Sequence, residues 1–347
     1  MKTRIFTKAA LSVIMLLALS ATVVSAKTWR INNDTRKQAN FTDINAAMAS
    51  ADVADGDTLY LDPGCVLASE QTISKAVTVI GTGYFLQNGV MAATINNRVY
   101  ISAEGTKLNG VCVNSEVYIR ANNITLERCK TQRVYSDGGT RYGLTVLQCY
   151  IHGYICIAGE FRSATIKNNV IMADNGYYYN TVIMSVHDSE ISNNYLAVIG
   201  SEYNRLRHVL YDVTNSQIYN NIIRHAIDPN LIFANSDAVN NNSFYNNVIT
   251  AAEGTYTNVS NIVWLGSADV SNVFAEGTDD AAYHLKEGSP AKGAAADGGD
   301  CGPYGGATPY VEGGKPLYHP FINDVTVSVK PVNGKIKLKL NAKMQNE

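Results

Sequence analysis

The sequence predicts an all-β solenoid, a parallel β-helix of about nine coils. Three observations predict it. Short segments of β type recur at steps of 20 to 27 residues. Each recurrence carries the same pattern, in which an apolar residue and two further residues are followed by Asn or Cys. Asparagine supplies 35 of the 347 residues, about one in ten.

The repeat excludes the other common repeat architectures. The pattern reads LERC, VLQC, IKNN, ISNN and IYNN, starting at Leu126, Val146, Ile166, Ile191 and Ile218. Leucine-rich repeats need a leucine scaffold, and propeller blades need about 40 residues. Helical repeats need apolar residues three and four apart, whereas these segments alternate. The remaining architecture is a parallel β-helix, in which successive coils stack about 4.8 Å apart.

The asparagine column has a physical reason in such a stack. An inward amide at a turn needs partners, and the same amide one coil away supplies them. Asn also tolerates the left-handed backbone of a tight turn. The predicted rungs are Asn169, Asn194 and Asn221. Farther along, either Asn242 or Asn247 could hold the repeated position.

Cysteines occupy the earlier positions of the same column. Cys129 and Cys149 are expected to act there as small buried hydrophobes. A disulfide between them is the alternative, because residues on adjacent coils are close enough to be bridged.

The first 26 residues predict export. Lys2, Arg4 and Lys8 precede an apolar stretch from Ala9 to Val24, and Val24-Ser25-Ala26 is a small-residue cleavage site. The apolar stretch is shorter than the roughly 20 residues of a membrane span. The mature chain would begin at Lys27 and be secreted, periplasmic or held at the cell surface.

The remaining chain divides into four predicted parts. Residues 27–56 form an N-terminal cap with a helix from Phe41 to Val53, and residues 57–277 form the coils. Residues 278–315, rich in glycine, close the other end. Residues 316–347 alternate around Asn333-Gly334 and predict a C-terminal β-hairpin.

Three segments resemble right-handed parallel β-helix proteins of the pectate-lyase-like superfamily. They are the opening strand GDTLYLDPG (Gly56 to Gly64), the run of Asn-marked coils, and the ending HLKEGSPAKGAAADGGDCGPYGG (His284 to Gly306). The resemblance implies a right-handed coil and a polysaccharide ligand, although this fold serves many activities. The G-H-G, R-I-K and W-I-D-H signatures of its main enzyme families are absent, and the coils lack paired aspartates.

Alternation along the strands predicts a first candidate surface. If Val99, Val117 and Val134 point inward, their neighbours point outward. Outward residues then include an aromatic ladder with arginines beside it: Tyr100, Tyr118, Tyr135, Arg98, Arg120 and Arg133. Rings can pack on sugar faces and Arg can bind carboxylates, so the ladder could bind an acidic sugar chain. Cross-strand packing is the alternative. The same alternation, with Val182 and Val209 inward, places Ile183 and Leu210 outward.

The long connections into the middle coils form a second candidate surface. In the superfamily that the chain resembles, such loops flank the substrate groove. By that resemblance Arg205, Arg207 and His208 are the candidate catalytic residues, with Arg207 or His208 as the base. Tyr178 and His225 would bind substrate, and Asp212 and Asp228 could bind Ca²⁺ through hard oxygens. The pair His187-Asp188 is interpreted as turn geometry.

Two functions remain open from the sequence. The first is a non-catalytic carbohydrate-binding or surface protein that engages polysaccharide, possibly acidic, as a monomer. The alternative is a polysaccharide lyase that cleaves an acidic polysaccharide by β-elimination. With 28 Lys and Arg against 30 Asp and Glu, the chain is not a nucleic-acid binder by charge. It also lacks the composition of a disordered chain.

Overall fold

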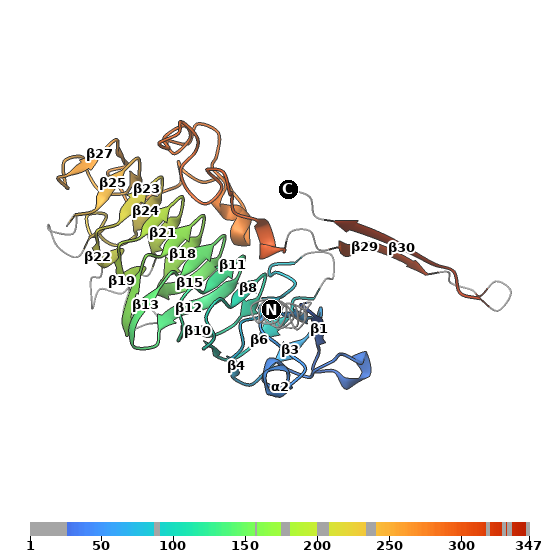
Figure 1. Cartoon of the computed structure of the whole chain (residues 1–347). Coiled ribbons are helices and arrows are strands. Elements are labelled where there is room, and N and C mark those ends of the chain that lie inside the picture. The colour runs from blue at the N-terminus through green and yellow to red at the C-terminus, as the bar shows by residue number, and fades with distance from the viewer. Residues whose placement is uncertain are drawn as a thin grey trace, which may run out of the picture.

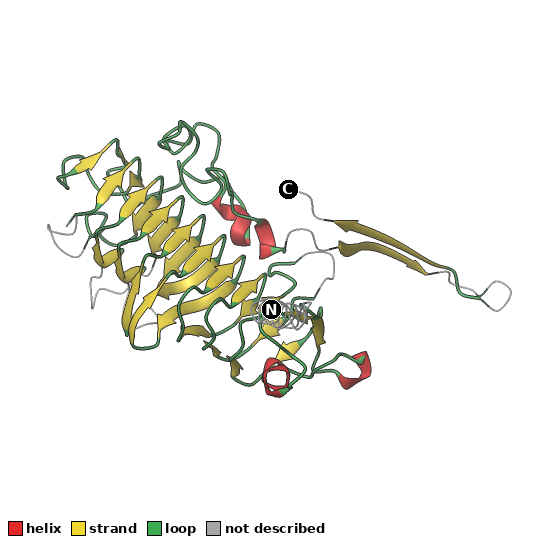
Figure 2. Ribbon diagram, viewed as in Figure 1, coloured by secondary structure: helices red, strands yellow, loops and turns green. Residues whose placement is uncertain are grey.

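The chain is a right-handed parallel β-helix (Figures 1 and 2). The computed structural model describes residues 26–86, 91–156, 158–174, 181–199, 208–233, 241–316, 320–327, 331 and 335–344. Within these ranges, none of the helices has both the length and the apolar character that a bilayer crossing requires.

One sheet takes a single short strand from each coil. Its eleven strands pair in parallel in the order in which they follow along the chain. They are β1 (Thr28–Ile31), β2 (Thr58–Leu61), β5 (Thr78–Ile80), β8 (Lys107–Asn109), β11 (Thr125–Glu127), β14 (Thr145–Leu147), β17 (Thr165–Lys167), β20 (Glu190–Ser192), β23 (Gln217–Tyr219), β25 (Ser243–Tyr245) and β27 (Val259–Ser260). Because β1 pairs with β2, this sheet already begins within residues 27–56.

The remaining strands of the coils join into a second, larger sheet that bends around the stack. Its strands are β3 (Val66–Leu67), β4 (Gln71–Ile73), β6 (Thr94–Ile95), β7 (Val99–Ile101), β9 (Cys112–Val113), β10 (Glu116–Ile119), β12 (Lys130–Ser136), β13 (Gly139–Tyr142), β15 (Tyr150–Ile155), β16 (Gly159–Arg162), β18 (Val170–Ala173), β19 (Ile183–His187), β21 (Tyr195–Val198), β22 (Leu210–Thr214), β24 (Ile222–His225), β26 (Val248–Ile249) and β28 (Val263–Trp264).

Inward side chains of both sheets form one continuous core. Val99, Val117 and Val134 are buried, as the alternation predicts. The prediction that Ile183 and Leu210 point outward is wrong, because both are buried. Ile155 pairs with Ile183, and Ile183 pairs with Leu210, so the register differs by one residue from the predicted one. Val182 and Val209 are buried as well, so strict alternation does not hold at the start of these two strands.

The predicted asparagine column is confirmed. The side-chain Nδ2 of Asn169 donates to Oδ1 of Asn194 at 2.9 Å, and Asn194 donates in the same way to Asn221 at 3.0 Å. Asn221 donates to Asn247 at 3.0 Å, so Asn247 holds the repeated position. The residue before each rung has a left-handed backbone, for example Asn193 at φ 53°. The turn therefore uses two properties of Asn at consecutive positions.

Asn242 belongs to a second turn column, which was not predicted from the sequence. The backbone N–H of Ser189 donates to Oγ of Ser216 at 3.1 Å, and that of Ser216 donates to Oδ1 of Asn242 at 2.7 Å. Here too the preceding residues, Asp188 and Asn215, are left-handed.

Five of the six cysteines lie in the coils, and Cys301 lies in the segment that follows them. Cys129 and Cys149 occupy the positions expected for them, and the backbone N–H of Cys129 contacts Sγ of Cys149 at 3.3 Å. All six cysteines are buried free thiols in the structure.

The N-terminal helix is shorter than the predicted span from Phe41 to Val53. It is α2 (Ile44–Ala49), and the carboxylate of Asp43 caps it by accepting from the N–H of Ala46. Phe41 instead bridges to Ile31 as an extended residue. The short helix η1 (Thr35–Lys37) precedes it.

Residues 278–315, here called the closing segment, run back along the side of the stack. Backbone oxygens of Ala294, Pro303 and Pro309 accept hydrogen bonds from Asn246, Asn168 and Gln148, in that order. Increasing residue number in the closing segment thus meets decreasing residue number in the coils. The outward amides of the left-handed turn residues provide these contacts. The segment includes η3 (Asp279–Tyr283) and η4 (Glu312–Gly314).

The C-terminal residues form an antiparallel pair of strands, in agreement with the alternation in the sequence. They are β29 (Pro320–Val327) and β30 (Leu338–Met344), which lie apart from the stack (Figure 1). The expected turn at Asn333-Gly334 lies outside the described residues.

Candidate functional site

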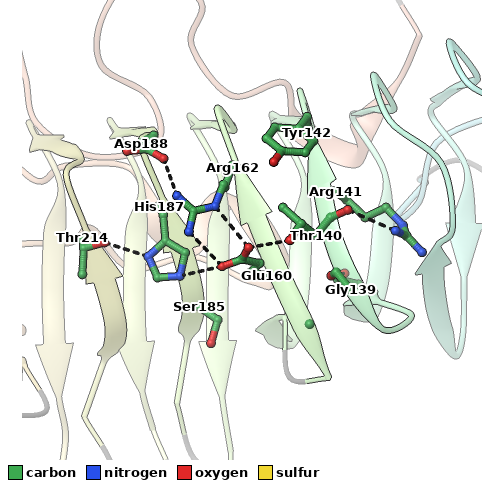
Figure 3. Close-up of polar contacts among 12 residues, drawn as sticks. Gly139, Thr140, Arg141, Tyr142, Glu160, Arg162, Ser185, His187, Asp188 and Thr214 are labelled. Atoms are coloured by element: carbon green, nitrogen blue, oxygen red, sulfur yellow. Dashed lines mark hydrogen bonds and ion pairs between the residues drawn. The ribbon is translucent and has the colours of Figure 1, made fainter.

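A network of charged side chains lies on the outer face of four neighbouring strands, β13, β16, β19 and β22 (Figure 3). We call it the polar cluster and define it as Glu160, Arg162, His187, Asp188 and Asp212. The strand register brings them together, because Arg162 is paired with His187 and His187 with Thr214.

Arg162 is bound on two sides. Its Nε and Nη2 donate to the two oxygens of Glu160 at 3.1 and 3.2 Å, and its Nη1 donates to Asp188 at 2.8 Å. The hydroxyl of Thr140 donates to Glu160 at 2.5 Å. Hydrogen bonds from Arg162, then from Thr140, lower the pKa of Glu160. Glu160 is therefore a fixed acceptor at neutral pH rather than a proton donor.

The His187 ring lies between Thr214 on one side and the carboxylates of Glu160 and Asp212 on the other. Its Nδ1 lies 2.8 Å from the hydroxyl of Thr214. Its Nε2 lies 3.5 Å from Glu160 and 3.8 Å from Asp212. Asp212 is half exposed, while the His187 side chain is only 9% exposed. Because the imidazole is almost fully buried, a ligand would meet the surrounding oxygens of Glu160 and Asp212 first. These oxygens can accept hydrogen bonds from a ligand.

A bend in the strands brings Asp212 to the surface. Ser185 and Asp212 have left-handed backbones, with φ of 51° and 53°, and Oγ of Ser185 donates to Asp212 at 3.0 Å. Non-glycine residues adopt this conformation rarely, and it interrupts the alternation of a strand. The inward residues Ile183 and Val186 are consequently three apart, with both Met184 and Ser185 between them.

Two exposed tyrosines lie at the two edges of this face. Tyr142 on β13 is 49% exposed, and Tyr211 on β22 is 44% exposed. The strands that carry them are three steps apart, about 14 Å at the usual spacing of strands. Each ring therefore leaves close to half of its surface free to contact a ligand.

The predicted tyrosine ladder is formed. Tyr100, Tyr118 and Tyr135 are directly paired across β7, β10 and β12. Their ring centroids are 5.0 and 4.8 Å apart, at interplanar angles of 31° and 11°. The rings therefore occupy one another's faces and present edges and hydroxyls outward.

The arginines beside the ladder are paired within the protein. Arg120 lies 4.1 Å from the centroid of the Tyr100 ring and forms an ion pair with Asp137. Arg133 is bound to Glu116 at 2.9 Å. Arg98 is bound to the same Glu116 at 3.1 Å. This geometry is that of cross-strand packing. A sugar chain at the ladder would meet hydroxyls and ion-paired guanidinium groups rather than open ring faces.

The second candidate surface is described only in part. Tyr178, Arg205 and Arg207 lie outside the described residues, and His208 is half-buried just before β22. Asp212 belongs to the polar cluster. His225 is fully buried, and its Nδ1 accepts from the backbone N–H of Asp228 at 3.0 Å. His225 thus stabilises a turn and does not reach the surface.

The described residues do not assemble a calcium site around the two predicted ligands. Oδ1 of Asp228 accepts from the backbone N–H of Asn230, as in a turn, and Oδ2 of Asp212 accepts from Ser185. Within the described ranges, no group of three or more His, Cys, Asp and Glu side chains could hold a metal ion. Because Arg205 and Arg207 lie outside the described residues, the catalytic roles expected for them and for His208 stay predictions.

The polar cluster was only partly visible in the sequence. Its histidine and Asp188 were interpreted as turn geometry, and Asp188 does have the left-handed backbone of a turn residue, with φ 53°. The useful signal was the register, which aligns residues 162, 187 and 214 although they are 25 and 27 residues apart.

Comparisons with known proteins give structural similarity only. No family model and no curated protein matches the chain. A crystal structure of pectate lyase Pel9A is similar with a TM-score of 0.47 and 13% identity, covering 81% of this chain and 97% of that one. A mannuronic acid specific polysaccharide family 6 lyase from human gut microbiota has a TM-score of 0.29 and 12% identity, covering 74% of this chain and 72% of that one. At these values neither structure assigns a substrate or a reaction to this chain.

Proposed function

We propose that the protein is an exported, non-catalytic polysaccharide-binding protein, and that its binding surface is the outer face of β13, β16, β19 and β22. The observation that carries this proposal is the pair of exposed tyrosines, Tyr142 and Tyr211, on either side of the polar cluster. Tyrosine rings pack on the apolar faces of sugars, and fixed charged groups bind sugar hydroxyls.

The charge of this face favours uncharged sugar units. Three carboxylates and one guanidinium leave two negative charges when His187 is neutral. A uronate carboxylate placed here would meet mostly like charge. The polar cluster instead offers acceptors and donors already held in place, so that little side-chain entropy is lost on binding.

The hydrogen bonds of Arg162 are the reason for preferring binding over β-elimination. A lyase needs a cation to stabilise the enolate that forms beside a uronate carboxylate. The guanidinium of this face, Arg162, already makes three hydrogen bonds to Glu160 and Asp188. Elimination remains the alternative, and the experiment below includes its readout.

The test is a binding assay with a panel of neutral polysaccharides, such as glucan, mannan and xylan, beside polygalacturonate and alginate. The double variant Tyr142→Ala/Tyr211→Ala is compared with Tyr245→Ala. Tyr245 stacks on Tyr219 in the other sheet and provides a matched tyrosine on another face. Each ring should contribute about 1 kcal/mol, or about fivefold in affinity.

We expect the double variant to weaken binding of a neutral polysaccharide at least tenfold, while Tyr245→Ala leaves it unchanged. Equal affinity of the double variant and the unchanged protein would disprove the assignment of this face. A rise in ultraviolet absorbance from an unsaturated uronate, with or without calcium, would replace binding by the lyase alternative. Far-ultraviolet circular dichroism of each variant controls for folding.

A further inference from the structure

The two ends of the stack differ in how they are covered. At the N-terminal end, α2 packs over the first coils. Its residue Ile44 is fully buried, and the backbone N–H of Ile44 donates to Oε1 of Gln71 on β4 at 3.0 Å. At the other end lies β27, which pairs with β25 and is the last strand of the first sheet (Figure 1). An uncovered end of a β-solenoid leaves strand edges and core residues open to contact.

The inward residues of the last coil are incompletely covered. Val259 on β27 pairs with Phe244, and Trp264 on β28 pairs with Ile249. Phe244 is 2% exposed and Ile249 is 0% exposed, whereas Val259 and Trp264 are only half-buried. The same positions of the repeat thus lose part of their cover in the last coil, as they would where a further layer is missing.

The chain that follows β28 leads away from this end. The backbone oxygen of Ala268 accepts from Nε of Arg224 on β24 at 2.9 Å. Farther on, the ring of Phe274 meets that of Tyr195 on β21 edge to face, with centroids 4.9 Å apart. Both partners belong to earlier coils. The chain therefore turns along the side of the stack, and the closing segment continues in that direction.

The open end is acidic, and the C-terminal residues are basic. Residues 225–270, which include the last coil, contain no Lys or Arg, and their acidic residues are Asp228, Asp237, Glu253 and Asp269. Glu253 and Asp269 are exposed. Residues 316–347 contain five lysines, at positions 330, 335, 337, 339 and 343, against two acidic residues, Asp324 and Glu347. Surfaces of opposite charge favour one another as partners.

The C-terminal hairpin is a two-stranded sheet in which β29 and β30 pair with each other. It extends from the stack on the side opposite to β27 (Figure 1). Ile336 and Leu338, at the start of β30, are 64% and 56% exposed. A two-stranded hairpin is marginally stable by itself and gains stability from a further strand or a surface to pack against. The hairpin therefore favours a partner that offers an open strand edge.

We propose that copies of this chain assemble head to tail, with the C-terminal hairpin of one copy pairing along β27 at the open end of the next. Strand addition supplies backbone hydrogen bonds, and the exposed residues Ile336 and Leu338 cover the half-buried residues of the last coil. Two hairpins are poor partners for each other, because like charges repel across paired strands.

Such a contact joins two different surfaces, so it extends into chains or closes into rings. The protein, expected from its sequence to be a monomer, would then be one only at low concentration. The proposal goes beyond the polysaccharide-binding face and does not rest on it, because the two surfaces share no residue.

The first test is sedimentation velocity of the full chain over a wide range of concentration, at low and at high salt. We expect the mean mass to rise with concentration beyond that of a dimer, and to fall as salt screens the opposite charges. A monomer at every concentration would overturn the proposal. That result is also expected if the hairpin folds back onto its own stack.

The second test reverses charges on the two surfaces. Ser260 is an exposed residue of β27, so its side chain can be changed without altering the core. Ser260→Lys should weaken self-association at least tenfold, whereas Ser260→Glu, the matched control, should leave it equal or stronger. The hairpin variant Lys335→Glu/Lys337→Glu/Lys339→Glu should also weaken it at least tenfold. Adding Ser260→Lys to this hairpin variant should restore part of the loss, which misfolding would not do.

The pattern of losses decides between the possible contacts. If only Ser260→Lys weakened association, two open ends would meet each other, and the hairpin would not be the partner. If only the hairpin variant weakened it, the hairpin would bind elsewhere, and β27 would not be the partner. Either result overturns the proposal. The Tyr142→Ala/Tyr211→Ala protein should assemble as the unchanged protein does, which separates this test from that of the polysaccharide face. Far-ultraviolet circular dichroism controls for folding.

Discussion

Asp280 is a buried carboxylate that ties two parts of the closing segment together and reaches the coils through Tyr310. Its Oδ2 accepts from the backbone N–H of Gly313 at 2.6 Å and from the hydroxyl of Tyr310 at 3.1 Å. Tyr310 in turn shares a 2.6 Å hydrogen bond with Tyr84. Burial is the main influence on its pKa and raises it, although the two hydrogen bonds oppose the change. Burial therefore disfavours the charged form of Asp280, and we expect the fold to tolerate a neutral side chain at this position.

We predict that Asp280→Asn raises stability at neutral pH and flattens its dependence on pH in acid. A carboxyl group whose pKa is raised on folding stabilises the protein below its unfolded pKa. That contribution is lost as pH rises through the folded pKa. Asn keeps an oxygen for Tyr310 and Gly313 but has no charge to bury. Thermal unfolding of both proteins at pH 4 and pH 7 checks this. A variant less stable than the original at pH 7 would show that the carboxylate is needed in its charged form.

At the scale of the elements, the closing segment depends on close approach of its own backbone. A Cβ at Gly305 would overlap the carbonyl oxygen of Asp300 and would lie 3.1 Å from Nδ2 of Asn193. The oxygen of Gly305 accepts from Asn168 at 2.7 Å. Glycine is required at this position by space rather than by backbone angle.

We predict that Gly305→Ala releases the closing segment from the coils at a cost of about 2 kcal/mol, typical of overpacking. Hydrogen exchange of residues 294–314 should speed up while circular dichroism of the coils is kept. Gly298→Ala is the control, because Gly298 has open space around it and a φ of +80°. It should cost only about 1 kcal/mol for the left-handed backbone. Unchanged exchange in Gly305→Ala would refute the role of this contact.

The elements also show which features a sequence can predict. The asparagine column was predictable because each rung follows a strand of regular length, so that Asn169, Asn194 and Asn221 repeat with a local pattern. The second column, at Ser216 and Asn242, has no comparable signal, since Ser and Asn are common in any turn.

Longer-range arrangements were harder to predict for a physical reason. The path of the closing segment depends on amides that point outward from distant coils, such as Gln148 and Asn168. The polar cluster depends on the left-handed residues Ser185 and Asp212, which change the alternation inside a strand. Neither is visible in hydrophobic periodicity, which reports inward positions only.

At the scale of the whole molecule, the stack begins directly after the predicted signal. The backbone nitrogen of Lys27 donates to Oδ1 of Asp57 at 2.7 Å, and Asp57 is only 1% exposed. Trp29 and Ala54 also donate to this carboxylate, at 2.8 and 3.0 Å. Cleavage after Ala26, which remains a prediction, would turn the Lys27 nitrogen into a charged amine next to a buried carboxylate.

We predict that a chain beginning at Lys27 is more stable than one beginning at Ala26, by about 1 kcal/mol, because a charged donor strengthens the bond to Asp57. Burial raises the pKa of Asp57, but hydrogen bonds from Trp29, Ala54 and Lys27 outweigh burial and lower it. Its contribution is therefore present above the unfolded pKa and is lost as pH falls through the folded one. Urea unfolding of both chains at neutral pH and in acid, each with and without Asp57→Asn, measures the coupling. The difference should vanish in acid and in the Asp57→Asn background. Equal stability of the two chains at neutral pH would show that the amine makes no ion pair, and the mass of the exported protein would show whether it begins at Lys27.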